Sequence, residues 1–319
     1  MKKTVFIILF ILILLQSIIW VNQENIMHPK KRLLQRYHHE WLDKPWKHGM
    51  KIQKHFTQAR TPYLLVEEDI SQGVSTRQKL LKEQLPTQNI NKDAGILVLL
   101  HGKNGRKEDL LPVAERYVAL GLTCLLVDLP HHGESNLKHL YYTKKKHEQL
   151  YVDEVLDDVS KYLKVKEKKL YIWGMSLGGA FAITNVFNSK YDFQAMVLVS
   201  TFERLDKVLK EKSLRIFGDF LGTLLYEGLE KSLVFFYNFN PKEVDSTKLA
   251  KGLKLPLYMV HGEEDSLIAY EQGEELFSSF NSQQKQFYLD KEGDHHNILI
   301  TKHQFYKESG LFFTLHSFN

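Results

Sequence analysis

Residues 170–180 contain the residue types that nucleophilic catalysis by a serine requires. Strand-like apolar residues lead into Gly174-Met175-Ser176-Leu177-Gly178, and apolar residues at helical spacing follow. A sharp strand-to-helix turn exposes a strained serine, and small residues two positions before and after it avoid collisions. The Leu177 amide would start the helix, where it can stabilise a developing oxyanion. The pattern predicts Ser176 as a nucleophile and Leu177 as an oxyanion-hole donor.

A serine hydroxyl needs a base to take its proton, and the base needs a carboxylate that orients it. Two later loops carry both residue types. Residues 261–266 (HGEEDS) follow an apolar run, and residues 293–297 (GDHHN) follow the last predicted strand. Because the carboxyl ends of parallel strands share one edge of a sheet, we expect both loops to lie near Ser176.

Apolar strands alternate with amphipathic helices from residue 96 onward, which predicts an α/β fold with a mostly parallel sheet covered on both faces. The strands are expected at 51–57, 62–68, 96–100, 122–129, 170–173, 195–201, 255–260 and 286–289. The helices are expected at 78–84, 107–120, 148–163, 177–187, 270–280 and 298–308. Residues 204–253 are helical in pattern and too long for one crossover, so they are expected to form a cap over the site. The core would then comprise residues 51–203 and 254–319.

The N-terminal segment suggests a membrane attachment. Residues 4–21 form an apolar block behind Lys2 and Lys3, with no small-residue cleavage site after it. We therefore expect residues 1–24 to be an uncleaved anchor or signal, and residues 25–50 a basic tether. Basic residues flank the block on both sides, so the charge rule does not fix its orientation. The signal-like start favours an extracytoplasmic catalytic domain.

The composition excludes several function classes. The chain has 319 residues, 43% of them hydrophobic, and a formal net charge of only +5 with scattered Lys and Arg, which argues against nucleic-acid binding. The single cysteine, Cys124, lies in an apolar run and allows no intramolecular disulfide. Adjacent histidines such as His131 and His132 point apart in a strand, and no zinc motif occurs, so no metal or other cofactor is expected. Residues 144–146 (KKK) are typical of a solvated loop.

Taken together, these motifs resemble those of the serine α/β-hydrolases, namely the capped esterase, lipase-like and serine aminopeptidase-like hydrolases, from about residue 51 to the C-terminus. The resemblance is carried by the motifs LHG at 100–102, DLPHHGES at 128–135, GMSLGG at 174–179, HGEED at 261–265 and GDHHN at 293–297. It implies an α/β-hydrolase fold with Ser176 as nucleophile, Asp265 as acid and His296 as base. It also implies that the Lys103 amide completes the oxyanion hole beside Leu177.

Some assignments remain open within this resemblance. The base could be His295 instead of His296, although the family pattern places the base before a small polar residue, here Asn297. Glu263, Glu264 and Glu203 are alternatives to Asp265, while Asp294 is expected to accept hydrogen bonds within its loop. The turn at 128–135 lacks the arginine of the family pattern and is expected to support the site without taking part in the chemistry.

The resemblance favours a carboxylic ester hydrolase that acts on a small-molecule or lipid-like ester through an acyl-enzyme. A peptidase or amidase with the same triad is one alternative. A catalytically silent, membrane-tethered binding module on the hydrolase scaffold is another. Apolar residues of the cap could line a groove for an acyl chain or only pack the cap on the core; they are Phe217, Phe220, Leu224, Tyr226, Phe235 and Phe236.

Overall fold

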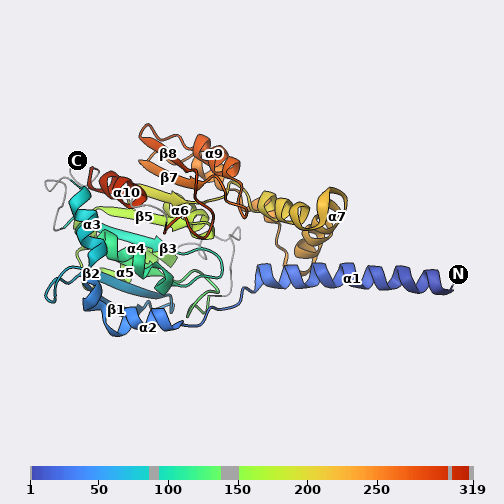
Figure 1. Ribbon diagram of the computed structural model, residues 1–319, viewed down its shortest axis with the longest axis horizontal. Coiled ribbons are helices and arrows are strands. Elements are labelled where there is room, and N and C mark those ends of the chain that lie inside the picture. The colour runs from blue at the N-terminus through green and yellow to red at the C-terminus, as the bar shows by residue number, and fades with distance from the viewer. Residues whose placement is uncertain (1, 86–92, 138–150, 301–303, 316–319) are drawn as a thin grey trace.

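An eight-stranded sheet forms the centre of the structure, a computed structural model that describes residues 2–85, 93–137, 151–300 and 304–315 (Figure 1). The strand order is β1-β2-β4-β3-β5-β6-β7-β8. The strands are β1 (Met50–Phe56), β2 (Pro62–Glu68), β3 (Gly95–Leu100), β4 (Leu122–Val127), β5 (Leu170–Met175), β6 (Phe193–Val199), β7 (Leu257–Gly262) and β8 (Lys285–Asp290). Strand β2 pairs antiparallel with β1 and β4, and all other neighbours are parallel.

Both faces of the sheet are buried, as near-continuous apolar strands require. In β3, Ile96, Val98 and Leu100 face one core while Leu97 and Leu99 face the other. One core is covered by α5 (Tyr151–Val159), α6 (Leu177–Asn188) and α9 (Tyr270–Ser279), and the other by α3 (Thr76–Gln84), α4 (Leu111–Val118) and α10 (Gln304–Leu315). The predicted α/β-hydrolase fold is therefore confirmed.

Several element boundaries differ from the expected ones. The helix expected at 107–120 divides into the short 3₁₀ helix η3 (Lys107–Leu110) and α4, which has a proline at its second position. The last helix begins at Gln304, six residues later than expected, because residues 295–300 form turns. Residues 86–92, 138–150 and 301–303 lie outside the described residues, so the lysine run at 144–146 and the expected helix start at 148 have no structural description.

The segment between β6 and β7 consists mainly of helix α7 (Leu205–Tyr237), followed by η6 (Pro241–Glu243) and α8 (Ser246–Ala250). Helix α7 bends sharply at Gly218, where φ is 74° and ψ is 173°. The two arms then fold together, because the Ser213 hydroxyl donates to the Gly222 carbonyl at 2.8 Å. A side chain at Gly222 would collide with Leu214. The bend thus makes a helical hairpin from one long helical run.

Helix α1 (Lys2–Met27) lies beside α7 and extends away from the sheet (Figure 1). Its C-terminal half is fixed to the second arm of α7 by polar contacts, in which Ser232 donates to Gln23 and Tyr237 donates to Glu24. The rings of Trp20 and Phe236 also meet edge to face. These contacts make α1 part of the same layer as α7.

The expected membrane anchor is not supported. Within residues 2–85, 93–137, 151–300 and 304–315, the structure contains no helix of sufficient length and apolar character to cross a membrane. The expectation of an anchored, extracytoplasmic domain is therefore wrong.

Residues 28–49 pack on the core through α2 (Arg36–Asp43) and η1 (Pro45–His48). His38 is buried and its Nε2 lies 2.8 Å from Asp109 Oδ1, while Arg32 reaches the same carboxylate at 3.2 Å. Trp41 is also buried. The segment expected as a basic tether therefore packs against the domain.

The bend of α7 provides a test of the hairpin. Replacing Gly218 by Ala should destabilise the protein by about 1–3 kcal/mol, because a side chain is strained at this φ and ψ even though no atom stands within 4 Å. The measurement is thermal or denaturant unfolding. Asp219→Ala, at the exposed neighbouring position, is the control and should leave the transition nearly unchanged. Equal stability of the Gly218→Ala protein would show that the bend is not strained.

Candidate active site

Ser176 lies at the turn between β5 and α6 with φ 55° and ψ −119°, a backbone conformation that is strained for a residue with a side chain. The strain is held by close packing on both sides. A Cβ at Gly174 would collide with the Gly178 backbone, and a Cβ at Gly178 would collide with the Leu100 carbonyl. The Ser176 amide donates to the Val199 carbonyl at 2.8 Å, which ties the turn to the end of β6. This is the geometry that the GMSLG motif predicts.

The carboxyl ends of the neighbouring strands meet beside this turn. Beyond Val199, the Ser200 amide donates to the Val260 carbonyl of β7 at 2.9 Å. On the far side of β7, the Glu263 amide donates to the Asp290 carbonyl of β8, also at 2.9 Å. A side chain at Gly262 would collide with Gly293. An unbroken series of contacts therefore links the Ser176 turn to the loops at 261–266 and 293–297.

Asp265 is the acidic residue that this arrangement buries. Its side chain accepts hydrogen bonds at Oδ1 from the Leu267 and Ile268 amides, both at 2.9 Å. Its Oδ2 lies 2.7 Å from His295 Nδ1 and 3.5 Å from His261 Nε2. Both carboxylate oxygens are thus engaged, and the carboxylate is held in one orientation.

The partner of Asp265 is His295, whereas the sequence favoured its neighbour His296. The His295 side chain is nearly buried and points to Asp265, while His296 is exposed. The turn explains the difference. Asp294 Oδ1 accepts from the amides of His296 and Asn297, both at 2.7 Å. The resulting turn separates the two imidazoles, whose ring planes are 88° apart.

The alternative acids do not share this environment. Glu263 and Glu264 are exposed. Glu203 is buried, but its carboxylate forms an ion pair with Lys207 at 2.5 Å. Asp294 accepts hydrogen bonds inside its own loop, as expected.

The electrostatics of Asp265 favour the carboxylate form. Burial alone would raise the pKa of the Asp265 carboxyl, but its hydrogen bonds with His261 and His295 and the Ile268 amide outweigh burial and lower that pKa. Because a carboxylate can only accept, His295 Nδ1 must donate the proton of the 2.7 Å contact. In neutral His295 the Nε2 atom then carries a lone pair and can accept a proton.

The loop after β3 lies on the other side of the Ser176 turn. A Cβ at Gly102 would stand 3.5 Å from the Ser176 Cβ, so this loop is in contact with the serine. Leu177 is the first residue of α6, and its amide therefore has no carbonyl partner within the helix. The residues Lys103 and Leu177, expected to form the oxyanion hole, thus lie on two segments that meet at Ser176.

A buried polar network supports the Gly102 loop. His101 Nε2 accepts the Leu129 amide at 3.1 Å, and its Nδ1 lies 2.8 Å from the Gly102 carbonyl, to which it donates. Asp128 accepts the Lys107 amide at 2.7 Å and the Lys107 ammonium at 2.8 Å. The turn at 128–135 therefore contacts the loop through side chains that hold its backbone, which agrees with a supporting role.

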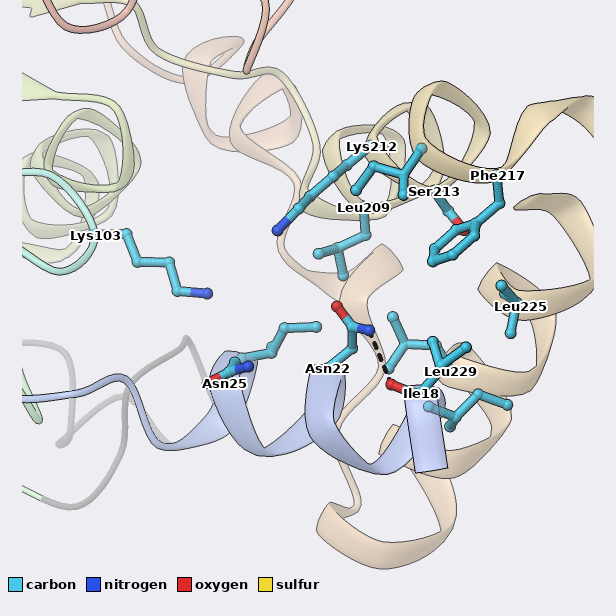
Figure 2. Close-up of a pocket in the computed structure, with 13 residues that line it drawn as sticks. Ile18, Asn22, Asn25, Lys103, Leu209, Lys212, Ser213, Phe217, Leu225 and Leu229 are labelled. Carbon is cyan, nitrogen blue, oxygen red and sulfur yellow. Dashed lines mark hydrogen bonds between the residues drawn. The ribbon is translucent and has the colours of Figure 1, made fainter. Parts of the chain in front are cut away.

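A pocket opens beside this loop between helices α1 and α7 (Figure 2). Its polar end carries Lys103 and Lys212, together with Asn22 and Asn25 of α1. The rest of the lining is apolar except for Ser213 and consists otherwise of Ile18, Ile19, Ile26, Leu209, Ile216, Phe217, Leu225 and Leu229. Of the cap residues proposed for a groove, only Phe217 lines this pocket, whereas Phe220 and Phe235 are more than four-fifths exposed to solvent.

Sequence reasoning missed Lys212 and the contribution of α1. A signal for Lys212 was present, because it lies between Leu209 and Ile216 at helical spacing and so interrupts the apolar stripe with a charge. No such signal exists for Ile18, Asn22 and Asn25, whose role depends on the contact between α1 and α7. Among the described residues, no three His, Cys, Asp or Glu side chains are grouped to hold a metal ion.

The low pKa of Asp265 predicts a pH-dependent contribution to stability. The pKa of the Asp265 carboxyl is lower in the folded protein than in the unfolded chain, so the ionised carboxylate stabilises the folded state. This stabilisation is present above the unfolded pKa of about 3.9 and is lost as the pH falls below it. We expect Asp265→Asn to cost about 1.5–3 kcal/mol at pH 7, since hydrogen bonds to a buried charge are lost. Denaturant unfolding of both proteins should show this deficit shrinking below pH 4. Glu263→Gln, an exposed change in the same loop, is the control. A deficit that stays constant with pH would contradict the assignment.

The comparisons with known proteins agree with this geometry. Residues 91–245 match the family model described as serine aminopeptidase, S33. No curated protein matches the chain.

Among solved structures, an esterase of Pyrococcus furiosus has a TM-score of 0.63 at 17% identity, covering 92% of this chain and 98% of that chain. A candidate lipase of Acinetobacter baumannii has a TM-score of 0.55 at 16% identity, covering 91% and 98%. At these identities the structures support the fold alone. The match over residues 91–245 and the observed fold support the predicted resemblance to the serine α/β-hydrolase family.

Proposed function

We propose that the protein hydrolyses carboxylic esters with Ser176 as nucleophile, His295 as base and Asp265 as the orienting acid. The observation that carries the proposal is the 2.7 Å contact between Asp265 and His295, on loops linked through the strand ends to the strained Ser176 turn. His295 replaces His296 in this assignment because a base must be held by its acid partner, and His296 is exposed.

The reaction would proceed in two steps. As the Ser176 Oγ attacks the ester carbonyl, its proton passes to His295 Nε2, and the new imidazolium is stabilised by Asp265. The oxyanion accepts hydrogen bonds from the Leu177 and Lys103 amides. When the tetrahedral intermediate collapses, the alcohol leaves with the proton from His295. Water then attacks the acyl-enzyme as His295 takes its proton, and His295 returns this proton to Ser176 Oγ when the acid is released.

The pocket supports an ester with an apolar acyl group. It begins at the Lys103 loop and continues between α1 and α7, where Ile18, Phe217 and Leu229 offer an alkyl chain apolar contacts. The Pyrococcus furiosus structure is that of an esterase, which points the same way.

Hydrolysis of a peptide or amide bond by the same triad is the second candidate, and the description of the matched family model as a serine aminopeptidase favours it. An amide leaving group is poorer than an alcohol and depends more on proton donation by His295. Ester and amide substrates with the same acyl group, assayed in parallel, would separate the two candidates by their kcat/KM values.

Ser176→Ala tests the nucleophile. The variant should lose at least about 10⁴-fold in kcat on p-nitrophenyl butyrate, because no other group can form the acyl-enzyme. A fluorophosphonate probe should label the wild type and leave the variant unlabelled. Wild-type protein that is not labelled and does not hydrolyse the ester would instead favour a silent binding module.

The neighbouring histidines give a matched pair of variants. His295→Ala should reduce kcat by about 10⁴-fold or more, because both the base and the Asp265 contact are lost. His296→Ala removes an exposed imidazole from the same loop and should keep kcat within about twofold. The measurement is steady-state ester hydrolysis, with unfolding curves to verify that both variants are folded. A greater loss for His296→Ala would reverse the assignment.

A further inference from the structure

The pocket between α1 and α7 has a cationic end that the hydrolytic mechanism does not use. Lys103 and Lys212 are the charged side chains of its lining, which includes no acidic residue among the described part of the chain. Figure 2 shows both lysines extending toward the same space beside α1. They come from the loop after β3 and from the first arm of α7, so two separate segments place positive charge at one point.

Neither ammonium forms an ion pair with a carboxylate of the described residues. The other polar side chains of the lining are better satisfied. Asn22 donates to the Ile18 carbonyl and Ser213 donates to the Gly222 carbonyl, each at 2.8 Å. Two ammonium groups of like charge repel each other, and an anion bound between them would relieve that repulsion. Among the described residues, the two lysines are therefore the charged groups of this pocket without a carboxylate partner.

The surroundings of Lys103 agree with this conclusion. Although its side chain reaches solvent within the pocket, the many protein atoms around its ammonium and, to a smaller degree, the charge of Lys212 lower the pKa of Lys103 to about 8. A bound anion would counter both effects, because it stabilises the charged ammonium and offsets the repulsion between the two lysines.

The position of the lysines relative to Ser176 gives the ligand its polarity. Lys103 directly follows Gly102, where a Cβ would stand 3.5 Å from the Ser176 Cβ, so the loop that carries Lys103 is the part of the lining that contacts the serine turn. The apolar end, formed by Ile18, Phe217, Leu225 and Leu229, lies between the two helices (Figure 2). A ligand that satisfies both ends is a single-chain amphiphile with its charged group at the end of the pocket beside the Gly102 loop.

We propose that this pocket selects single-chain esters that carry an anionic group, a phosphate or carboxylate, with Lys103 and Lys212 binding the anion and helices α1 and α7 enclosing the alkyl chain. The selection rests on the proposed ester hydrolysis, because it assigns the substrate class of the same site. Binding of the anion, however, requires no catalysis and can be measured separately.

The first experiment measures binding to the Ser176→Ala protein. Its probes are decyl phosphate, decanoate and the uncharged decyl alcohol, each below the concentration at which it aggregates, followed by titration calorimetry. The phosphate should bind at least about tenfold more tightly than the alcohol, as expected for an anion that forms charge-assisted hydrogen bonds with two cations. The decanoate arm shows whether a carboxylate is accepted as well as a phosphate. Equal affinity for all three probes would overturn the proposal.

Substitution of each lysine by Met in the Ser176→Ala protein removes the charge and keeps an unbranched apolar side chain. Lys103→Met and Lys212→Met should each weaken decyl phosphate binding by about tenfold and leave decyl alcohol binding much less changed. Lys210→Met is the matched control, since Lys210 lies on the same helix but lines a different surface hollow. If Lys210→Met weakens phosphate binding equally, the attraction is a general effect of net charge and the proposal fails.

The second experiment compares hydrolysis of decanoyl glycerol with that of decanoyl glycerol phosphate by the otherwise wild-type protein. We expect a higher kcat/KM for the phosphate ester, and a ratio that falls about tenfold in Lys212→Met. Hydrolysis of both esters at equal rates would refute the anion preference and leave the ester hydrolase proposal standing. If neither ester is hydrolysed while decyl phosphate still binds through the lysines, the proposed function fails and the anion site remains.

Discussion

Parallel pairing of β3, β5, β6, β7 and β8 is the constraint on which the rest of the structure depends. Parallel strands place their carboxyl ends at one edge, and hydrogen bonds there join Ser176 to Val199 and Ser200 to Val260. Strand pairing therefore brings together loops that are far apart along the chain, and contacts between their side chains are not needed for this. The strain at Ser176 can persist because the backbones of Gly174 and Gly178 pack too closely for the turn to relax.

Much of this architecture follows from sequence pattern because the pattern reports local physics. Apolar strands that are buried on both faces, and glycines flanking Ser176, are sufficient to predict the sheet and the strained turn. The resemblance to the family pointed to Asp265 among its acidic neighbours, and the structure buries it while Glu263 and Glu264 are exposed.

The choice between His295 and His296 could not be made from sequence in the same way. Adjacent side chains point in different directions. Which one faces Asp265 depends on the turn that Asp294 closes by accepting hydrogen bonds from the amides of His296 and Asn297. The family pattern selected His296 by its position before Asn297, but Asn297 contributes its side chain to the turn itself, where it accepts the Asp294 amide at 2.7 Å. The pocket was also beyond sequence reasoning, since it exists only where α1 meets α7.

The contact between α1 and α7 has a practical consequence for anyone who prepares the protein. The first 27 residues have the composition of a leader that is commonly trimmed before expression. A shortened chain that starts at His28 would keep every strand of the sheet, together with Ser176, Asp265 and His295, and could look intact by its fold. It would nevertheless lack Ile18, Asn22 and Ile26, so the pocket would lose the wall that α1 provides. Assays on such a truncated protein would test Ser176, Asp265 and His295 without the pocket that we propose selects the substrate.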